Sequence, residues 1–398
     1  MNPFGTNAKC YFVTLAAALV MLLAVAGCSG EKDEAVKDHS AEGPCAWTAG
    51  GELPVVADLD ARLAGYVPTD LSPELGHLDA TQTQVLEKLV AASKLMNEIF
   101  AVQATPCREE LEARIAELPA DLRDGAARYF RINYGPWDRR FHHEPFFGSW
   151  EHPAGANYYP LDLTEDEKAM IADPANGLDG LFTMVRRDDA GALKAVPYSE
   201  YFTGQLQEAA GLLNEAASLT GNASLKAFLE SRAKAFLTDD YFESDMLWMD
   251  LDSAVEVTIG PYETYEDGLF GYKAAFESFV TVTDPEESAR LAKFKDELPW
   301  LESQLPIPDE HKNMNRGSES PIRVVDEVYS AGDTRAGIQT IAFNLPNAER
   351  VREAKGSKKV LLRNVMKAKF DRILMPIAQV LVAEDQLGDL TAESFFLH

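Results

Sequence analysis

The sequence predicts an α+β protein that is mainly helical, with a small β-rich core in its second half. Apolar residues recur at three- and four-residue steps before residue 250 and again after residue 349, which is typical of amphipathic helices. Between these regions, four short runs alternate apolar and polar residues, as half-buried strands do. Of the 398 residues, 46% are hydrophobic and 25% are charged, so the chain can bury a large core.

The first residues have the build of a secretory signal. Lys9 supplies the only charged side chain before an apolar run, Tyr11–Gly27, which is shorter than the roughly 20 apolar residues of a spanning helix. Small residues precede Cys28, and the chain turns polar at Ser29. This pattern resembles a bacterial lipobox, so we expect residues 1–27 to be removed and Cys28 to be lipidated. The alternatives are an ordinary signal peptide or a core helix with a chance cysteine.

The length left after the signal suits two domains or one large two-lobed body. Gly and Pro residues make the segment after Cys28 a tether. The predicted boundaries are a signal peptide at 1–27, a flexible tether at 28–50, a helical N-terminal region at 51–250, a β-rich core at 251–348 with a helical insertion at about 284–320, and the helical start of a further lobe at 349–398.

Charge limits the partners of the chain. Its net charge is −27, from 64 acidic and 37 basic residues. Nucleic-acid binding requires a basic face, so we expect no nucleic-acid partner. Acidity also repels anionic lipid head groups, so we expect the lipid on Cys28 to be the only membrane link.

Two cysteines remain once Cys10 leaves with the signal and Cys28 carries lipid. Cys45 lies in the tether and Cys107 follows a predicted helix end. In an oxidising compartment they form one disulfide or stay separate thiols, and neither has zinc-ligand spacing.

Helices are expected on both sides of the β-rich core. An aromatic, loop-rich stretch should run from Tyr129 to Tyr159. From Glu349 the helical period returns, and Pro376 should kink or restart that helix. The predicted helices before residue 250 are Val85–Phe100, Glu109–Leu118, 199–219 and 223–237.

The alternating runs predict strands. On the first run, Glu256 and Thr258 lie on the face opposite Val255. If the apolar face packs inward, Glu256 faces a cleft or solvent. The predicted strands are Ala254–Ile259, Phe276–Thr283, Ile322–Tyr329 and Gly337–Phe343.

Most familiar catalytic machinery is missing from the sequence. A helical zinc-protease site needs two histidines one turn apart, with a glutamate beside the first to activate the metal-bound water. His143 and Glu144 begin such a pattern, but Pro145 breaks the helix and Phe147 stands where the second histidine is needed. We therefore expect no catalytic residue and no metal ligand within this chain.

Polar residues at one strand end form a candidate peptide-binding turn. Asn344-Leu345-Pro346-Asn347 places two side-chain amides close together, where they can pair with an extended peptide backbone. Glu256 on the first predicted strand is a separate candidate. Each also has a simpler interpretation, because a strand glutamate is often merely solvated and Asn-x-Pro-Asn often only makes a turn.

Longer motifs carry a resemblance to a known family. The blocks Ile259-Gly260-Pro261-Tyr262-Glu263-Thr264-Tyr265-Glu266-Asp267 and Gly268-Leu269-Phe270-Gly271-Tyr272-Lys273 resemble the dipeptidyl peptidase III family, in its bacterial branch and the related domain of plant Nudix-type fusion proteins. The likeness extends to Ile132–Arg139, Ala156–Pro160, Ser330–Gly337, Asn344–Asn347 and Lys355–Val360.

The resemblance implies a two-lobed zinc hydrolase with a wide cleft between a helical zinc lobe and a lobe with a β-core. In that family a strand glutamate and the asparagines of an Asn-x-x-Asn turn hold the free N-terminus of the substrate. Glu256, Asn344 and Asn347 are the matching positions here. Such residues suit an ammonium group, which has three donors.

The sequence departs from the family pattern in two ways. The family has a tyrosine two residues after the glutamate, where Thr258 stands. Tyr262 or another donor would substitute for it. The zinc-binding His-Glu-x-x-(x)-His helix should begin near His398, so we expect the zinc lobe to be incomplete, with the zinc ligands of the full-length protein beyond residue 398.

The predicted function is zinc-dependent peptide hydrolysis of the dipeptidyl peptidase III type, with this chain alone inactive. One alternative is a non-catalytic peptide-binding envelope lipoprotein, and another is a related zinc hydrolase with a non-dipeptide substrate. The predicted partners are a peptide and a membrane reached through the lipid anchor. Ser29 after the lipid cysteine favours the outer membrane, facing the periplasm.

Overall fold

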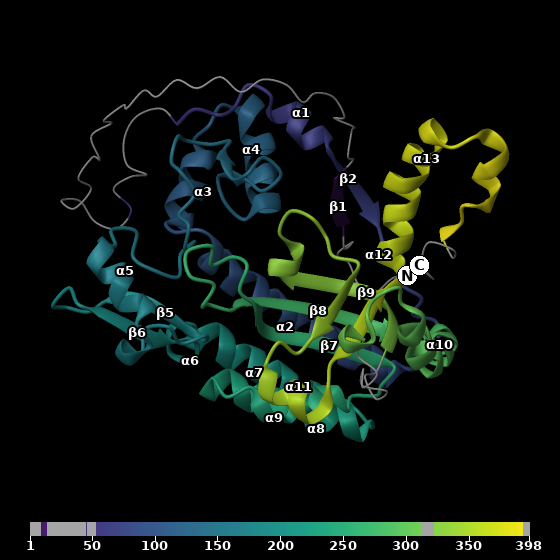
Figure 1. Cartoon of the computed structure of the whole chain (residues 1–398). Coiled ribbons are helices and arrows are strands. Elements are labelled where there is room, and N and C mark those ends of the chain that lie inside the picture. Colours follow the sequence, from purple (N-terminus) through teal and green to yellow (C-terminus); the bar gives the residue numbers. More distant parts are fainter. Residues whose placement is uncertain (1–8, 14–44, 46–52, 313–321, 393–398) are drawn as a thin grey trace.

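The computed structural model describes residues 9–13, 45, 53–312 and 322–392 (Figure 1). The predicted lipidation site Cys28 and most of the predicted signal and tether lie outside these residues. Strand β1 (Lys9–Val13) pairs antiparallel with β2 (Tyr66–Asp70). Within the described ranges, none of the helices combines the length and apolar character that crossing a bilayer requires.

A five-stranded mixed sheet forms the centre of the molecule. Its order is β10-β11-β9-β8-β7, and only β11 and β9 run parallel. Residues of all five strands are buried in one large hydrophobic cluster. The strands are β7 (Val255–Glu263), β8 (Ala275–Thr283), β9 (Ile322–Gly332), β10 (Ala342–Leu345) and β11 (Lys358–Leu362).

The structure corrects two secondary-structure predictions in this region. The predicted strand Gly337–Phe343 is wrong over most of its length, because β10 begins at Ala342 after a short 3-10 turn, Asp333–Arg335. The predicted return of helix from Glu349 holds for α11 (Glu349–Lys355) but is interrupted by strand β11. Pairing of β11 with both β10 and β9 outweighs the local apolar period.

A layer of long helices covers the sheet. Helix α2 (Ala80–Ala104) begins with a capping box between Asp79 and Gln82 and packs against β7, β8 and β9. The hydroxyls of Ser93 on α2 and Ser278 on β8 lie 2.7 Å apart in the buried contact. Helices α7 (Thr203–Leu219) and α8 (Ala223–Thr238) pair with each other, and α7 also packs on α2, as amphipathic helices bury their apolar stripes.

A second hydrophobic cluster lies beside the sheet, built from α1 (Leu59–Ala64), α3 (Arg108–Ala116) and α4 (Ala120–Asn133). Helix α4 runs into the stretch that was predicted to be loop-rich. The short strands β3 (Trp137–Asp138) and β4 (Glu144–Pro145) pair after it. A disulfide joins Cys45 to Cys107, where α3 begins.

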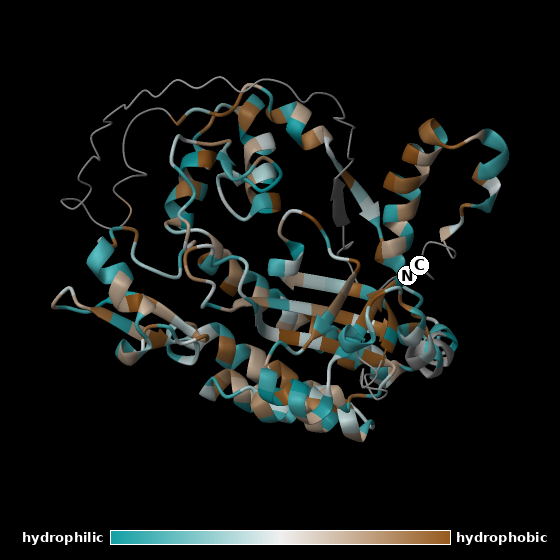
Figure 2. Ribbon diagram, in the orientation of Figure 1, coloured by the Kyte–Doolittle hydropathy of each residue, from teal (hydrophilic) through white to brown (hydrophobic). Residues whose placement is uncertain are grey.

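The remaining elements surround these two bodies. Helix α10 lies within the predicted helical insertion, and Pro376 stands in the first turn of α13, after a π-helical segment, as a restarted helix requires. Helix α13 carries hydrophobic residues (Figure 2), and two of them are largely exposed, Val380 at 83% and Leu381 at 77%. These elements are α5 (Glu165–Ala172), β5 (Thr183–Arg187), β6 (Leu193–Pro197), α6 (Tyr198–Tyr201), α9 (Phe242–Met249), α10 (Pro285–Gln304), α12 (Arg363–Lys369) and α13 (Met375–Leu381).

Candidate functional site

The two ends of strand β7 differ in how far they are buried. From Val255 to Tyr262 every residue is buried, and Glu263 at the end of the strand is half-buried. Two residues later Tyr265 is 84% exposed. The C-terminal end of β7 therefore reaches the surface and carries a carboxylate and a phenol.

The Asn-x-x-Asn turn lies against this end of β7. Asn344 and Asn347 are both exposed, and the intervening Leu345–Pro346 peptide is cis. The side-chain amide of Asn347 donates to the carbonyl oxygen of Tyr262 at 3.2 Å. This bond joins the turn that follows β10, at one edge of the sheet, to β7 at the other edge, so the structure brings Asn347 to the residue before Glu263.

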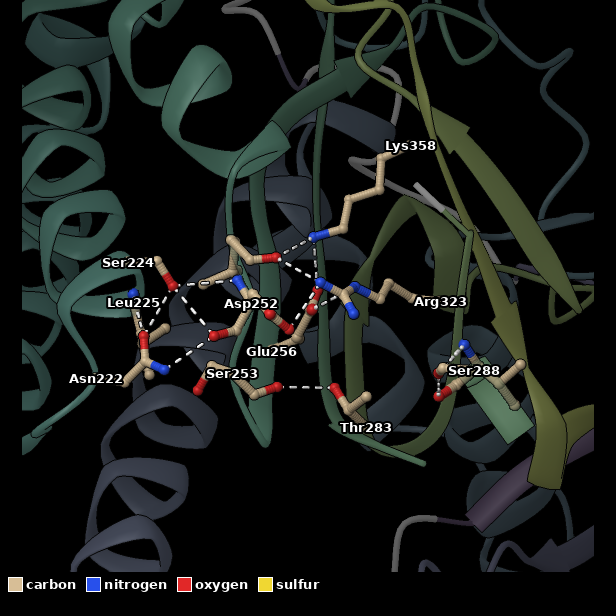
Figure 3. A network of polar contacts seen from close by, with 12 residues as sticks. Asn222, Ser224, Leu225, Asp252, Ser253, Glu256, Thr283, Ser288, Arg323 and Lys358 are labelled. Atoms are coloured by element: carbon tan, nitrogen blue, oxygen red, sulfur yellow. Dashed lines mark hydrogen bonds and ion pairs between the residues drawn. The ribbon is translucent and has the colours of Figure 1, made fainter. Parts of the chain in front are cut away.

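Glu256 is in a different place. It is only 3% exposed, and its Oε2 atom accepts from Lys358 Nζ at 2.8 Å (Figure 3). The expectation that Glu256 faces a cleft or solvent is wrong, because neither face of β7 is open at this position. Glu263 lies seven positions further along the extended strand, which is about 23 Å at the usual strand rise.

Thr258 and Tyr262 also point inward. Thr258 is buried, and the Tyr262 hydroxyl donates to the Ile259 carbonyl oxygen at 3.1 Å. Burial raises the pKa of Tyr262 above its ordinary value, and the nearby Arg232 guanidinium opposes that rise. The Tyr262 hydroxyl, predicted as a substitute donor to substrate, is thus engaged within the protein.

Sequence reasoning missed Glu263 and Tyr265. Their spacing is the signal that identifies them, since a tyrosine stands two residues after Glu263 but not after Glu256. The apolar alternation drew attention to Glu256, which lies within the alternating run Ala254–Ile259. Glu263 lies where that pattern ends, and strand ends are where polar side chains reach a surface.

The loop that follows β7 is held rigidly. Asp267 accepts hydrogen bonds from four backbone amides between residues 269 and 273 and from the Tyr159 hydroxyl at 2.6 Å. Glu266 forms a two-pronged ion pair with Arg139 at 2.7 and 2.8 Å. Burial alone would raise the pKa of Glu266, but the Arg139 guanidinium outweighs burial and lowers it. Tyr265 therefore projects from a fixed loop.

Acidic groups gather behind the exposed end of β7. Glu277 on β8 is buried, and burial together with Asp333 and Glu263 raises its pKa well above the ordinary range. Burial and then Glu266 raise the pKa of Asp333 to about 7. Excess carboxylates at this place favour a cationic group, and an ammonium is one.

The described residues do not fit a zinc ion. The only close group of three potential ligands among them is Cys45, Cys107 and Glu110, and the two sulfurs are joined in a disulfide. In the sequence, no His-Glu pair has a second histidine four or five residues after the first. No step of a mechanism is assigned to a metal in this chain.

Comparisons with known proteins identify the family and the fold. The family model described as peptidase family M49 matches residues 190–386. Nudix hydrolase 3 of Arabidopsis thaliana is 34% identical over 399 residues, covering 85% of this chain and 51% of that protein. Dipeptidyl peptidase 3 of Dictyostelium discoideum is 29% identical over 178 residues, covering 44% of this chain and 24% of that protein.

Two solved structures share the fold. The structure of DPP III from Caldithrix abyssi has 51% identity and a TM-score of 0.77, over 80% of this chain and 62% of that one. Dipeptidyl-peptidase III from Corallococcus sp. strain EGB has 42% identity and a TM-score of 0.78, over 87% and 65%. The fold is thus the α+β fold of dipeptidyl peptidase III, as predicted. The chain belongs to peptidase family M49, and it spans about half the length of the plant relative.

Proposed function

We propose that this chain binds peptides by their free N-terminus at the exposed end of β7. Glu263 is the charge partner of the ammonium group, and Asn344 and Asn347 align the first residues of the peptide. The observation that carries the proposal is the hydrogen bond from Asn347 to the Tyr262 carbonyl, because it fixes the turn beside Glu263. Burial and neighbouring carboxylates disfavour the charged forms of Glu277 and Asp333, and a cation bound at this place would favour them.

In this proposal Glu263 takes the role that the sequence gave to Glu256. The family pattern has a tyrosine two residues after the glutamate, and Tyr265 satisfies it. The departure at Thr258 then disappears, and with it the reason to favour a non-dipeptide substrate. Tyr265 is exposed enough to donate to a bound peptide.

Binding is tested with an alanine tetrapeptide on the 398-residue chain by calorimetry. Acetylating the peptide removes the ammonium, and we expect at least about a tenfold loss of affinity, because hydrogen bonds to charged groups are the strong ones. Glu263→Gln should lose as much for the free peptide and nothing further on acetylation. Glu353→Gln, an exposed carboxylate on α11, is the control and should bind normally. Equal affinity of the free and acetylated peptides would contradict the assignment.

We also propose that the protein hydrolyses peptides with zinc when the family's His-Glu-x-x-(x)-His helix is present, and that the 398-residue chain alone binds without cleaving. Membership of a peptidase family supports this function over a non-catalytic binding lipoprotein. Release of dipeptides by the 398-residue chain, stopped by a chelator, is the result that rules out the second part.

The location in the cell envelope is part of the same proposal. We infer that Cys28 is lipidated and anchors the protein at the outer membrane, facing the periplasm. The support is the apolar run that ends in small residues before Cys28. Labelled palmitate should enter the wild-type protein and Cys10→Ser, and it should not enter Cys28→Ser. Label in Cys28→Ser would exclude this anchor.

A further inference from the structure

A buried ion-pair network joins strands that are not neighbours in the sheet (Figure 3). Lys358 on β11 is fully buried, and its ammonium donates to Glu256 Oε2 at 2.8 Å, to the Leu251 carbonyl at 3.1 Å and to the Trp248 carbonyl at 3.3 Å. All three of its donors are therefore used. The ammonium also lies 4.8 Å from the centre of the Trp248 ring.

Arg323 on β9 completes the network. Its Nε atom lies 3.4 Å from Glu256 Oε1, and its Nη2 atom donates to Asp252 Oδ1 at 2.8 Å. Glu256 thus meets two cations from two other strands. A lone carboxylate would be costly at this depth, and these partners compensate for its burial.

The network reaches the candidate site through backbone pairing. In the antiparallel pair of β11 and β10, Lys358 stands directly opposite Leu345, the residue after Asn344. Because β10 and β11 are hydrogen-bonded to each other, a shift of the backbone at Lys358 should also move the Asn344–Asn347 turn. The turn has a second attachment in the bond from Asn347 to Tyr262.

Both attachments end on the same strand. Lys358 holds Glu256 at the start of β7, and Asn347 holds Tyr262 near its end. Strands β9 and β8 lie between β11 and β7 in the sheet, so no backbone hydrogen bonds of the sheet join β7 to β11 directly. The side chains of Glu256 and Lys358 make that connection.

We propose that Glu256, Lys358 and Arg323 form a latch that holds the asparagine turn in register with Glu263, so that these three are positioning residues for peptide binding. The proposal rests on the proposed function, because it assigns a use to the alignment of that site. Glu256 then acts on peptide affinity without touching the peptide.

Hydrogen exchange of the free 398-residue chain tests the latch without any peptide. In Lys358→Met we expect the amides of β10 and β11 to exchange at least about tenfold faster, with β8 little changed. Leu111→Ala is the matched control, since it removes a fully buried side chain from the separate helical cluster. It should leave β10 and β11 protected.

Peptide affinity gives the second readout. Lys358→Met should bind the free tetrapeptide at least about tenfold more weakly, Lys358→Arg should recover part of the loss, and Leu111→Ala should bind as the wild type does. Unchanged exchange in β10 and β11, or a uniform increase in every strand, would overturn the latch. If the wild type binds no peptide, the proposed function fails while the exchange result still decides the latch.

Discussion

The two ends of strand β7 carry the same kind of residue in opposite settings. Glu256 is buried beside a lysine and an arginine, whereas Glu263 is half-buried beside other carboxylates and an exposed tyrosine. When a carboxylate is paired with fixed cations, its charge is compensated within the protein, so it attracts a charged ligand only weakly. A carboxylate among other carboxylates attracts a cation from outside. The surroundings of the two glutamates therefore indicate a structural role for Glu256 and a binding role for Glu263, although both lie on one strand.

The largest expected effect is the difference in stability between Glu256→Gln and Glu263→Gln. Losing the Glu256 charge leaves the buried Lys358 ammonium without a carboxylate, and removal of one partner of a buried pair costs about 3 kcal/mol. Glu263→Gln removes one of the charges that raise the pKa of Glu277 and breaks no ion pair found among the described residues, so it should be neutral or slightly stabilising. Urea unfolding of both variants at pH 7 measures the difference.

The pH dependence sharpens this first prediction. Burial lowers the pKa of Lys358 in the folded chain, although Glu256 opposes that shift. In Glu256→Gln the pKa should fall further, so the unfolded state binds more protons than the folded state and stability rises with pH. The deficit of the variant should therefore shrink toward pH 10. A deficit that grows with pH would show that Lys358 does not depend on Glu256.

Part of this architecture was predictable because the local pattern was unambiguous. The helix pair near 199–237 and the strands that became β8 and β9 follow clear periods of 3.6 and 2. Strand β11 was not predictable, since Val360, Leu361 and Leu362 are consecutive apolar residues that fit either period. Its pairing with β9 and β10 decides the outcome.

The site was predictable only in part for the same reason. Asn344 and Asn347 were found because a turn brings them together locally. The spacing of Tyr265 from Glu263 is a sequence signal, but the pairing of Glu256 within the protein depends on contacts from far along the chain. Lys358 lies 102 residues after Glu256, and no period or spacing records that contact.

An intermediate effect is expected at Asp333, which belongs to the acidic group near Glu263. Its pKa of about 7 in the folded chain exceeds the ordinary aspartate value, because burial and Glu266 disfavour the charge. The folded state then holds a proton that the unfolded state releases, so wild-type stability falls as pH rises from about 4 to 7. Asp333→Asn should be more stable at pH 8, by an amount on the order of 2 kcal/mol, and equal near pH 4. Thermal unfolding across this range checks the trend, and a pH-independent difference would refute it.

The smallest expected effect is at Asp252, on the exposed side of the latch. Its side chain is 77% exposed, although its Oδ1 atom lies 2.8 Å from Arg323 Nη2. Exposed ion pairs contribute little because water and salt screen them, so Asp252→Asn should change stability by less than about 0.5 kcal/mol. Urea unfolding beside Glu256→Gln measures both in one series. If Asp252→Asn destabilises the chain as much as Glu256→Gln does, the strength of the latch lies in its exposed pair. If Asp252→Asn costs much less stability than Glu256→Gln, the buried Glu256–Lys358 contact is the part of the network that stabilises the start of β7.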